Sequence, residues 1–328
     1  MHMIRLATIG SNWITEKFID AALQTQQYQL TAIYSRDINK ARQFAQKYNV
    51  NVIYDDLIQL ADDTNIDVVY IASPNSLHFA QAKLMLENNK DVICEKPLTS
   101  NLEQTQRLVD FAKQNKQIIF EALKTFYLPN FELIRNYLPK LGKIHKALLS
   151  YCQYSSRYPS YLDGENPNTF NPQFSNGSIM DIGVYPLNFA IGLWKKPSSI
   201  YASGTQLDSG VDAHGTVLLT YDDFDVIIWH SKVTNSFIHS EIQGEDGSLI
   251  IKHLSGCEQV FYQPRQGELQ EITLKQNSNE MYYEALEFAD LYRLRQINHK
   301  GLKYSLISSE LLTEIRKQIN VKFPADND

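Results

Sequence analysis

The first 122 residues alternate between short apolar runs and segments with helical spacing, and this alternation constrains the fold more than any other feature. Residues 4–9 form a β-rich run, and 14–23 follow with apolar side chains at helical spacing. The same order recurs along the chain, with strand-like stretches at 30–35, 67–72, 91–95 and 117–122. Because parallel strands need a covering connection, this pattern predicts a doubly wound parallel sheet, an α/β fold of the Rossmann type.

Longer strand-like stretches replace this alternation after Ala122. They lie at 144–155, 214–221, 224–233, 239–251 and 258–264. The turns YDDFD and GEDG between some of them are typical of β-hairpins. Three further segments have the periodicity of helices, and they span 177–194, 282–295 and 304–319. This part of the chain is therefore expected to be of α+β type, built on a large, mainly antiparallel open β-sheet.

A chain of 328 residues exceeds the usual size of one hydrophobic core. We therefore expect two domains, residues 1–122 and residues 123–328. The first would carry the parallel sheet, and the second would bind substrate and form the contacts of an oligomer.

Charge and cysteine usage argue against several classes of protein. The formal net charge is −6, and no Lys/Arg cluster is dense enough to neutralise a nucleic-acid backbone. No apolar run approaches the length of about 18 residues that suggests a membrane span, and the opening residues lack the features of a signal peptide. Cys94, Cys152 and Cys257 are far apart, which argues against a disulfide framework. We expect a cytoplasmic protein with no nucleic-acid partner, no membrane segment and no metal ion.

The first strand-to-helix turn reads Gly10-Ser11-Asn12-Trp13-Ile14 and keeps only the first glycine of the GxGxxG pattern of dinucleotide-binding turns. Glycine permits the tight turn, and the following helix points backbone N–H groups at a pyrophosphate. Asn12 stands where the second glycine would, and asparagine adopts the left-handed conformation at low cost. These five residues are therefore predicted to bind the cofactor, although a generic turn between a strand and a helix would fit the pattern equally well.

The second strand ends at Ser35-Arg36, where a dinucleotide-binding domain contacts the adenosine ribose. An NAD site more often carries an acid there, whereas a hydroxyl and a guanidinium suit a 2′-phosphate. We therefore expect NADP(H) to be the preferred cofactor and NAD(H) the second option. The alternative is that Arg36 is a solvated surface side chain.

Two further turns follow predicted parallel strands. They contain Ser73, Pro74, Asn75 and His78 in the first turn, and Glu95, Lys96 and Pro97 in the second. Together with the Gly10 turn they resemble the Gfo/Idh/MocA family of sugar and polyol oxidoreductases, over nearly the whole chain. The resemblance implies that both turns line the cofactor site, that Lys96 contacts substrate and nicotinamide, and that a cis bond precedes Pro97. A lysine at the carboxyl edge of a parallel sheet also lies where such sheets bind ligands.

The segment GSIMDIGVY at 177–185 is similar to the GGxxxDxGxH pattern of the same family, with two departures. Asn176 stands where a second glycine is common, and Tyr185 replaces the histidine. Tyrosine is found there in the branch that contains glucose-fructose oxidoreductase and the dihydrodiol and xylose dehydrogenases, which are NADP-linked. Asp181 and Tyr185 are four residues apart and share a helix face. The resemblance implies that Lys96, Asp181 and Tyr185 are catalytic, the tyrosine as a proton donor or acceptor, whereas the alternative is a core tyrosine with a satisfied hydroxyl.

The reaction that the resemblance implies is reversible hydride transfer between nicotinamide and a carbinol or carbonyl carbon of a sugar, polyol or diol. Two alternatives stay open. One is a dinucleotide-binding regulatory protein without turnover, and the other is a glycoside hydrolase that uses bound NAD as a transient redox relay.

The predicted antiparallel sheet has too few helices to cover both of its faces. We expect Val217, Leu219, Ile227 and Trp229 to form an apolar patch on the open face, and monomers seldom expose such a patch. The sequence therefore predicts a homodimer or a higher homo-oligomer that associates through this sheet.

Overall fold

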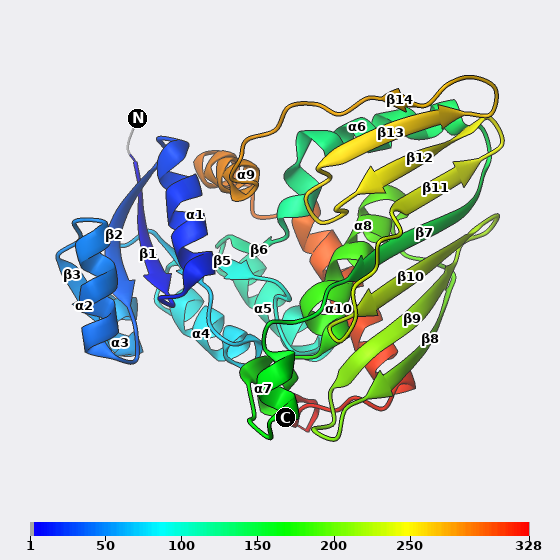
Figure 1. Cartoon of the computed structure of the whole chain (residues 1–328). Coiled ribbons are helices and arrows are strands. Elements are labelled where there is room, and N and C mark those ends of the chain that lie inside the picture. Colours follow the sequence, from blue (N-terminus) through cyan, green and yellow to red (C-terminus); the bar gives the residue numbers. More distant parts are fainter. Residues whose placement is uncertain (1–2, 328) are drawn as a thin grey trace. The chain divides into compact units, whose positions relative to one another are not determined.

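The computed structural model describes residues 3–327 and divides the chain into two compact units (Figure 1). The first unit contains the residues up to Ala122 together with Asn277–Leu306. The second contains Leu123–Gln276 and the residues from Ile307 onward. The sequence-based boundary after residue 122 coincides with the first division, but it assigned 277–306 to the second domain.

The segment Asn277–Leu306 belongs with the first unit because of the contacts that its helix makes. Helix α9 (Met281–Leu294) packs against α1 (Trp13–Gln24), and the buried Tyr28 hydroxyl donates a hydrogen bond to the Ala285 carbonyl at 2.6 Å. Local periodicity predicts such a helix but does not say on which sheet it packs, so this return of the chain was not predictable.

A six-stranded parallel sheet in the order β3-β2-β1-β4-β5-β6 forms the first unit. Its strands are β1 (Ile4–Ile9), β2 (Tyr28–Tyr34), β3 (Val52–Tyr54), β4 (Val68–Ile71), β5 (Asp91–Glu95) and β6 (Ile119–Ala122). Its other helices are α2 (Ile38–Lys47), α3 (Leu57–Asp62), α4 (Asn75–Glu87) and α5 (Leu102–Gln114). The predicted doubly wound fold is confirmed. The short β3 and α3 were missed, since neither is long enough to show a period.

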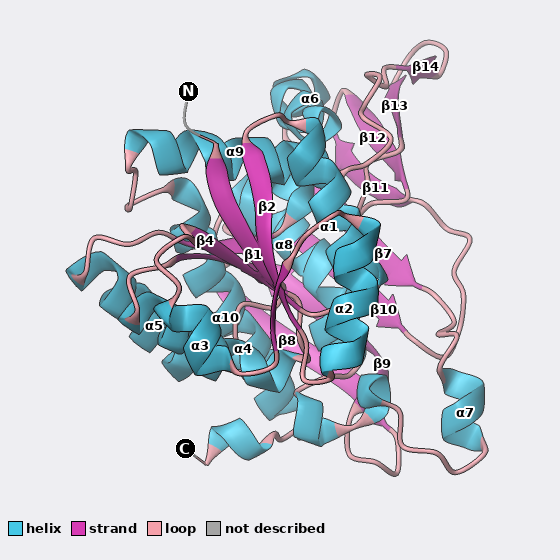
Figure 2. Cartoon of the chain, turned by 90° about the vertical axis from the view of Figure 1, so that its left-hand side faces the viewer, coloured by secondary structure: helices cyan, strands magenta, loops and turns pink. Residues whose placement is uncertain are grey.

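Helices cover both faces of this sheet (Figure 2). On one face Ile19, Ile33 and Phe44 form a buried cluster that joins α1, β2 and α2. On the other face Met85 of α4 and Leu108 of α5 belong to the larger core. The strand order reverses between β1 and β4, and doubly wound sheets bind ligands outside the carboxyl ends of the strands at such a point.

An eight-stranded sheet in the order β14-β13-β12-β11-β7-β10-β9-β8 forms the second unit. Its strands are β7 (Ile144–Cys152), β8 (Ser199–Gln206), β9 (Asp212–Thr220), β10 (Asp225–Ser231), β11 (Ser240–Gly244), β12 (Gly247–Lys252), β13 (Gln259–Pro264) and β14 (Gln270–Glu271). Its helices are α6 (Pro129–Tyr137), α7 (Tyr158–Leu162) and α8 (Val184–Trp194), and α10 (Lys300–Gln318) enters it at Ile307. Only β7 and β10 pair in parallel, so the predicted mainly antiparallel sheet is confirmed, while β8 and β14 were missed.

Helix α8 packs on β7 and β10 and covers one face of this sheet (Figure 1). Val217 and Leu219 point to this covered face and are fully buried, so their predicted place on the open face was wrong. The pairing explains the error, because Val217 lies opposite the buried Ile228. Ile227 and Trp229 alternate with Ile228 and lie half-buried on the other face, as predicted.

None of the helices formed by residues 3–327 is both long and apolar enough to cross a membrane.

Candidate functional site

Gly10 forms the turn between β1 and the N-terminus of α1. Its φ is +118°, which favours glycine, and a Cβ built there would lie 2.8 Å from the Ala72 carbonyl oxygen. The turn thus passes close to the end of β4 and leaves no room for a side chain. This cradle fits the close approach of a dinucleotide phosphate to the start of a helix.

Asn12 does not take the left-handed conformation that the sequence suggested. Its φ is −113° and its ψ 177°, and it is the N-cap of α1. Its Oδ1 accepts hydrogen bonds from the backbone N–H groups of Ile14 at 3.0 Å and Thr15 at 3.2 Å, while its Nδ2 donates to the Ala72 carbonyl at 3.2 Å. Asparagine therefore replaces the second glycine as a side-chain cap and a link to β4. Ser11 lies beside it, and Trp13, which begins α1, is 72% exposed.

Ser35 and Arg36 follow β2 at the same edge of the sheet. The Ser35 side chain is buried, and its hydroxyl accepts a hydrogen bond from the Asp37 N–H at 3.3 Å. Arg36 is exposed and has no hydrogen bond or ion pair with any residue that the structure describes. Its guanidinium is thus available to an anionic group at the end of β2.

A buried histidine joins the two turns that follow β4 and β5. His78 of α4 has its Nδ1 2.9 Å from the Pro97 carbonyl oxygen and its Nε2 3.0 Å from the Ser73 carbonyl oxygen. Burial lowers the pKa of this imidazole below its usual value, which favours the neutral ring. Pro74 and Asn75 lie between these contacts, where α4 begins. The role of His78 within the first unit is thus to fix one turn against the other.

Lys96 follows β5 directly, and its bond to Pro97 is cis. The preceding Glu95 is buried, and its carboxylate accepts a hydrogen bond from the Tyr70 hydroxyl at 2.6 Å. Lys96 itself is half-buried. The neighbours of the lysine are thus fixed at the carboxyl end of β5.

Glu121 of β6 holds the other side of this turn. Its Oε1 accepts a hydrogen bond from the Leu98 N–H at 2.9 Å. Burial raises the pKa of Glu121 to about 6, against the opposing effects of hydrogen bonds from Ser305 and Leu98. Glu121 was not predicted as a site residue, because its contact depends on the register of β5 and β6.

The segment predicted as one buried helix consists of a π-helix, Ile179–Gly183, followed by α8. Asp181 lies in the π-helix and Tyr185 in the first turn of α8, and both are half-buried. Such π-helical turns occur frequently at functional sites. The change of helix type was not predicted, since the apolar pattern of the segment is compatible with either geometry.

Two glycines of this motif allow it to approach the sheet. Gly177 has φ +134°, and a Cβ there would collide with the Asp212 carboxylate. A Cβ at Gly183 would lie 3.0 Å from the His230 ring and 2.8 Å from the Ile179 side chain. The glycine positions of the motif are therefore explained by close packing of the π-helix on β9 and β10.

Asp212 of β9 and His230 of β10 contact the residues at the start of the π-helix. The Asp212 Oδ2 accepts a hydrogen bond from the Ile179 N–H at 2.6 Å, and the Ser178 hydroxyl lies 2.9 Å from His230 Nδ1. Burial raises the pKa of Asp212 to about 6 and lowers the pKa of His230 to about 3. The imidazole is therefore neutral at pH 7, and its approach to the Asp212 carboxylate is not an ion pair.

Lys232 follows β10 and forms an ion pair with Asp181. The side chain of Lys232 is 8% exposed, whereas that of Asp181 is 33% exposed. Sequence reasoning missed Lys232, because nothing distinguishes a lysine at the end of a strand until the strand is placed beside the π-helix.

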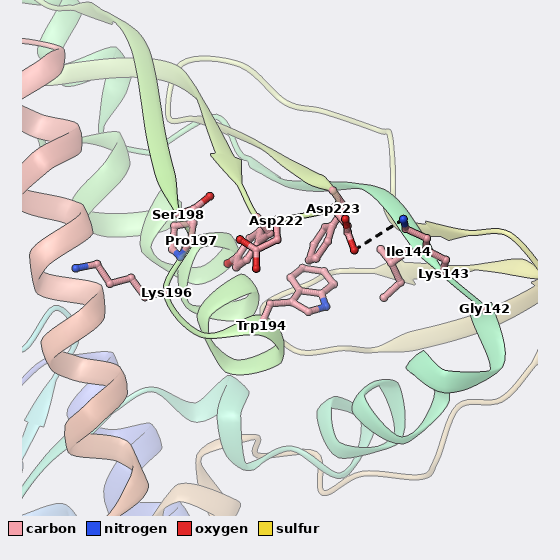
Figure 3. Close-up of a pocket in the computed structure, with 11 residues that line it drawn as sticks. Gly142, Lys143, Ile144, Trp194, Lys196, Pro197, Ser198, Asp222 and Asp223 are labelled. Carbon is pink, nitrogen blue, oxygen red and sulfur yellow. Dashed lines mark ion pairs between the residues drawn. The ribbon is translucent and has the colours of Figure 1, made fainter.

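The second unit also has a pocket of about 600 Å³ lined by Trp194, Tyr221 and Phe224, with an ion pair between Lys143 and Asp223 at its rim (Figure 3). It lies where β10 begins, whereas Lys232 follows the opposite end of that strand. None of the predicted site residues lines this pocket.

The predicted site residues thus form two groups, one in each unit. The glycine turn, Ser35, Ser73 and Glu95 end or follow β1, β2, β4 and β5, so the carboxyl edge of the parallel sheet brings the predicted cofactor residues together. Asp181 and Tyr185 lie in the second unit, where Asp181 forms an ion pair with Lys232. Among residues 3–327, no group of three or more His, Cys, Asp or Glu side chains is arranged to hold a metal ion.

A doubly wound sheet with a glycine turn before α1, followed by a large open sheet, defines a protein with a dinucleotide-binding domain and a second α+β domain. Residues 4–123 match the model of the oxidoreductase family with an NAD-binding Rossmann fold, and residues 139–250 match the GFO/IDH/MocA C-terminal domain. The chain belongs to the Gfo/Idh/MocA family of NAD(P)-dependent oxidoreductases.

Curated relatives match this chain over almost its whole length. An uncharacterised oxidoreductase of Escherichia coli, YgjR, is 52% identical, and each chain is covered to 99%. The scyllo-inositol 2-dehydrogenase (NADP(+)) IolU of Bacillus subtilis is 42% identical, again over 99% of each chain. The trans-1,2-dihydrobenzene-1,2-diol dehydrogenase of Sus scrofa is 28% identical over 98% of this chain and 99% of the relative.

Solved structures share the fold at lower identity. A 3-ketoreductase from Actinomadura kijaniata, in complex with NADP, superposes with a TM-score of 0.86 at 20% identity, covering 97% of this chain and 98% of the other. An aldose-aldose oxidoreductase from Caulobacter crescentus gives a TM-score of 0.84 at 17% identity, with the same coverage.

Proposed function

We propose that this protein is an NADP-linked dehydrogenase that interconverts a hydroxyl and a carbonyl group on an uncharged polyhydroxylated ring, a cyclitol or a sugar. The observation that carries the proposal is the position of Asp181 in the π-helix and of Tyr185 in the first turn of α8, which follows it directly. A carboxylate held by a lysine accepts hydrogen bonds from hydroxyls, and a phenol four residues away can exchange a proton. The 42% identity to a scyllo-inositol 2-dehydrogenase supports this substrate class.

The residues at the carboxyl edge of the parallel sheet fit a nicotinamide dinucleotide. The Gly10 cradle and the start of α1 would hold the pyrophosphate, together with Ser11, Trp13 and the Ile14 backbone. Arg36 and Ser35 would hold the 2′-phosphate of NADP. The turns that contain Ser73, Pro74, Asn75, His78, Glu95 and Pro97 would form the wall beside the nicotinamide. When bound, the cofactor supplies or accepts the hydride.

Three side chains would act on the substrate. In the direction of alcohol oxidation the carbinol carbon loses a hydride and the hydroxyl loses its proton. We assign Tyr185 to accept that proton, Lys96 to stabilise the negative charge that develops on the oxygen, and Asp181 to hold neighbouring hydroxyls. In reduction the same groups act in reverse.

A substrate screen tests this proposal. Purified protein is incubated with inositol isomers, aldoses and dihydrodiols, each with NADP and with NAD, and absorbance at about 340 nm is followed. We expect turnover with NADP and at least one cyclitol or sugar. Tight cofactor retention with hydrolysis of glycosides and no net absorbance change would instead indicate a redox-relay hydrolase. Cofactor binding without turnover on any member of the panel would indicate a regulatory protein.

We further propose that the protein works in the cytoplasm as a homodimer or higher homo-oligomer. The three cysteines are free thiols, which suits a reducing compartment. On the open face of the second sheet, Leu148, Ile227 and Leu218 lie directly opposite one another on neighbouring strands. A second copy of this face would cover that apolar row.

A further inference from the structure

Among residues 3–327, Lys232 is one of two buried lysines, the other being Lys90, and its position is fixed by its backbone. Its N–H donates to the Ala213 carbonyl at 2.9 Å, and its carbonyl accepts from the Ser155 N–H at 2.8 Å. The Ser231 hydroxyl accepts hydrogen bonds from the backbone N–H groups of Val233 at 3.3 Å and Thr234 at 3.1 Å. The start of the lysine side chain is therefore held at the end of β10, where the π-helix packs against the strand.

The ammonium of Lys232 is directed at Asp181 and is largely shielded from solvent. A buried charge is costly unless it is paired, and here the pair supplies the compensation. The exposure of the two partners is unequal, because the lysine is 8% exposed and the carboxylate 33% exposed. A ligand that approaches this end of the sheet from solvent can therefore contact the Asp181 carboxylate, while the Lys232 ammonium is largely shielded from solvent.

The titratable groups around this pair lie on β7, β9, β10 and the first turn of α8. His230 is neutral, while the Asp212 carboxylate lies under the start of the π-helix, and Lys232 is among the groups that lower the pKa of Asp212. Tyr151 of β7 contacts the Tyr185 ring, with centroids 5.6 Å apart. Lys232 thus pairs with Asp181 and also acts electrostatically on Asp212.

We propose that Lys232 is a positioning residue that holds the Asp181 carboxylate with its exposed side toward solvent, so that Asp181 accepts hydrogen bonds from substrate hydroxyls. This inference rests on the proposed function and names a residue that determines substrate affinity. An ionised carboxylate only accepts hydrogen bonds, so it selects a ligand that donates them. The lysine neutralises the carboxylate without competing for its exposed side.

The test compares Lys232→Met, which deletes the charge and keeps the stem, with Lys232→Arg, which keeps the charge. The matched control is Lys146→Met, since Lys146 forms an exposed ion pair with Asp225 at the opposite end of β10, 3.7 Å apart. For the best polyol of the screen we expect the KM of Lys232→Met to rise about 10- to 100-fold, with a smaller fall in kcat. This pattern indicates that the ground state and the transition state of the substrate lose similar binding energy. The KM for NADP should be nearly unchanged. Lys232→Arg should recover most of this loss, and Lys146→Met should match the wild type. A wild-type KM for the polyol in a folded Lys232→Met protein would overturn the inference while leaving the proposed function intact.

A second measurement needs no turnover. The melting temperatures of Asp181→Asn, Lys232→Met and the double variant form a cycle, and residues in contact give non-additive losses. We expect the double variant to lose clearly less than the sum of the single losses, because each single change already breaks the pair. Additive losses would overturn the inference even if the substrate screen found no activity. Should Lys232→Met not fold, the cycle is run with Lys232→Gln, which also deletes the charge, and the same criterion.

Discussion

Buried charged side chains contact two segments that carry proposed catalytic residues, the turn after β5 and the π-helix. Glu121 binds the Leu98 N–H two residues beyond Lys96, and Lys232 pairs with Asp181. A charge removed from water must find a partner, so each of these groups fixes the backbone or side chain that it contacts. The predicted catalytic groups are thus positioned by hydrogen bonds and ion pairs with side chains that need not contact the substrate.

The predicted preference for NADP(H) depends on a single guanidinium, that of Arg36. A charge-assisted hydrogen bond to the 2′-phosphate contributes on the order of 1.5 to 3 kcal/mol. We expect Arg36→Ala to weaken NADPH binding by about tenfold or more and to leave NADH binding nearly unchanged, as measured by quenching of protein fluorescence. The control is Arg42→Ala, which removes an exposed arginine on α2 that contacts Asn39. Equal losses for both cofactors, or tighter wild-type binding of NADH, would contradict the cofactor assignment.

The sequence could predict the residues at strand ends but not the side chains that support them. Gly10, Arg36 and Lys96 directly follow or end apolar runs, and the carboxyl ends of parallel strands share one edge. The supporting contacts of Asp212 and Lys232 could be recognised only from the structure, because they depend on the packing of the π-helix against β9 and β10. Asn12 was assigned to the correct turn but to the wrong conformation, because its capping hydrogen bonds compete with the left-handed form.

The π-helix is the element whose placement matters most for the second unit. Gly183 permits its close contact with His230, and Asp212 binds its first backbone N–H. Periodicity in the sequence predicted a helix over 177–194, and a helix is present over most of that range. The i→i+5 hydrogen bonding of the π-helical part was not predictable, because the apolar pattern of the segment is compatible with either helix type.

The stability of this element should depend on pH through Asp212. Its pKa is raised to about 6 in the folded protein, above the ordinary value of 3.8, so the folded state favours the protonated form. The corresponding stability is present below about pH 4 and is lost as the pH rises through 6. Relative to Asp212→Asn, the wild type should therefore lose on the order of 2 to 3 kcal/mol of unfolding free energy between pH 4 and 7.5.

Chemical denaturation of the wild type and the variant at several pH values checks this expectation. Asp208→Asn is the control, since Asp208 is exposed on the loop before β9. A difference between wild type and Asp212→Asn that does not change with pH would show that burial does not set the titration of this carboxyl.

At the scale of the whole molecule, the sequence predicted two sheets of different type, and the chain has both. It could not predict that 277–306 returns to the first unit, because a contact such as that of Tyr28 with Ala285 is remote in sequence. It also placed Val217 and Leu219 on the wrong face, since both faces of β9 carry apolar side chains and alternation alone does not say which one helices cover.

The open face of the second sheet should be the surface through which copies associate. Ile227 lies in the centre of its apolar row, so Ile227→Glu would place a charge inside the proposed interface. We expect the wild type to have at least a dimeric mass by light scattering at micromolar concentration and the variant to have a monomeric mass. Ile58→Glu is the matched control, because Ile58 is 61% exposed on α3 of the other unit. A monomeric wild type would rule out this assembly.

The proposed dehydrogenase reaction depends most directly on Lys96, which is proposed to stabilise an oxygen that becomes more negative during the reaction. Lys96→Met keeps the length of the side chain and deletes its charge, and Lys83→Met removes a surface lysine of the same unit, paired with Glu87, as a control. The decisive measurement is the turnover number of these proteins with NADP and the best polyol of the screen, beside their dissociation constants for NADPH. We expect Lys96→Met to lose roughly 100- to 1,000-fold in turnover with only a modest change in NADPH affinity, and Lys83→Met to behave as the wild type. A folded Lys96→Met protein with near wild-type turnover would contradict the account.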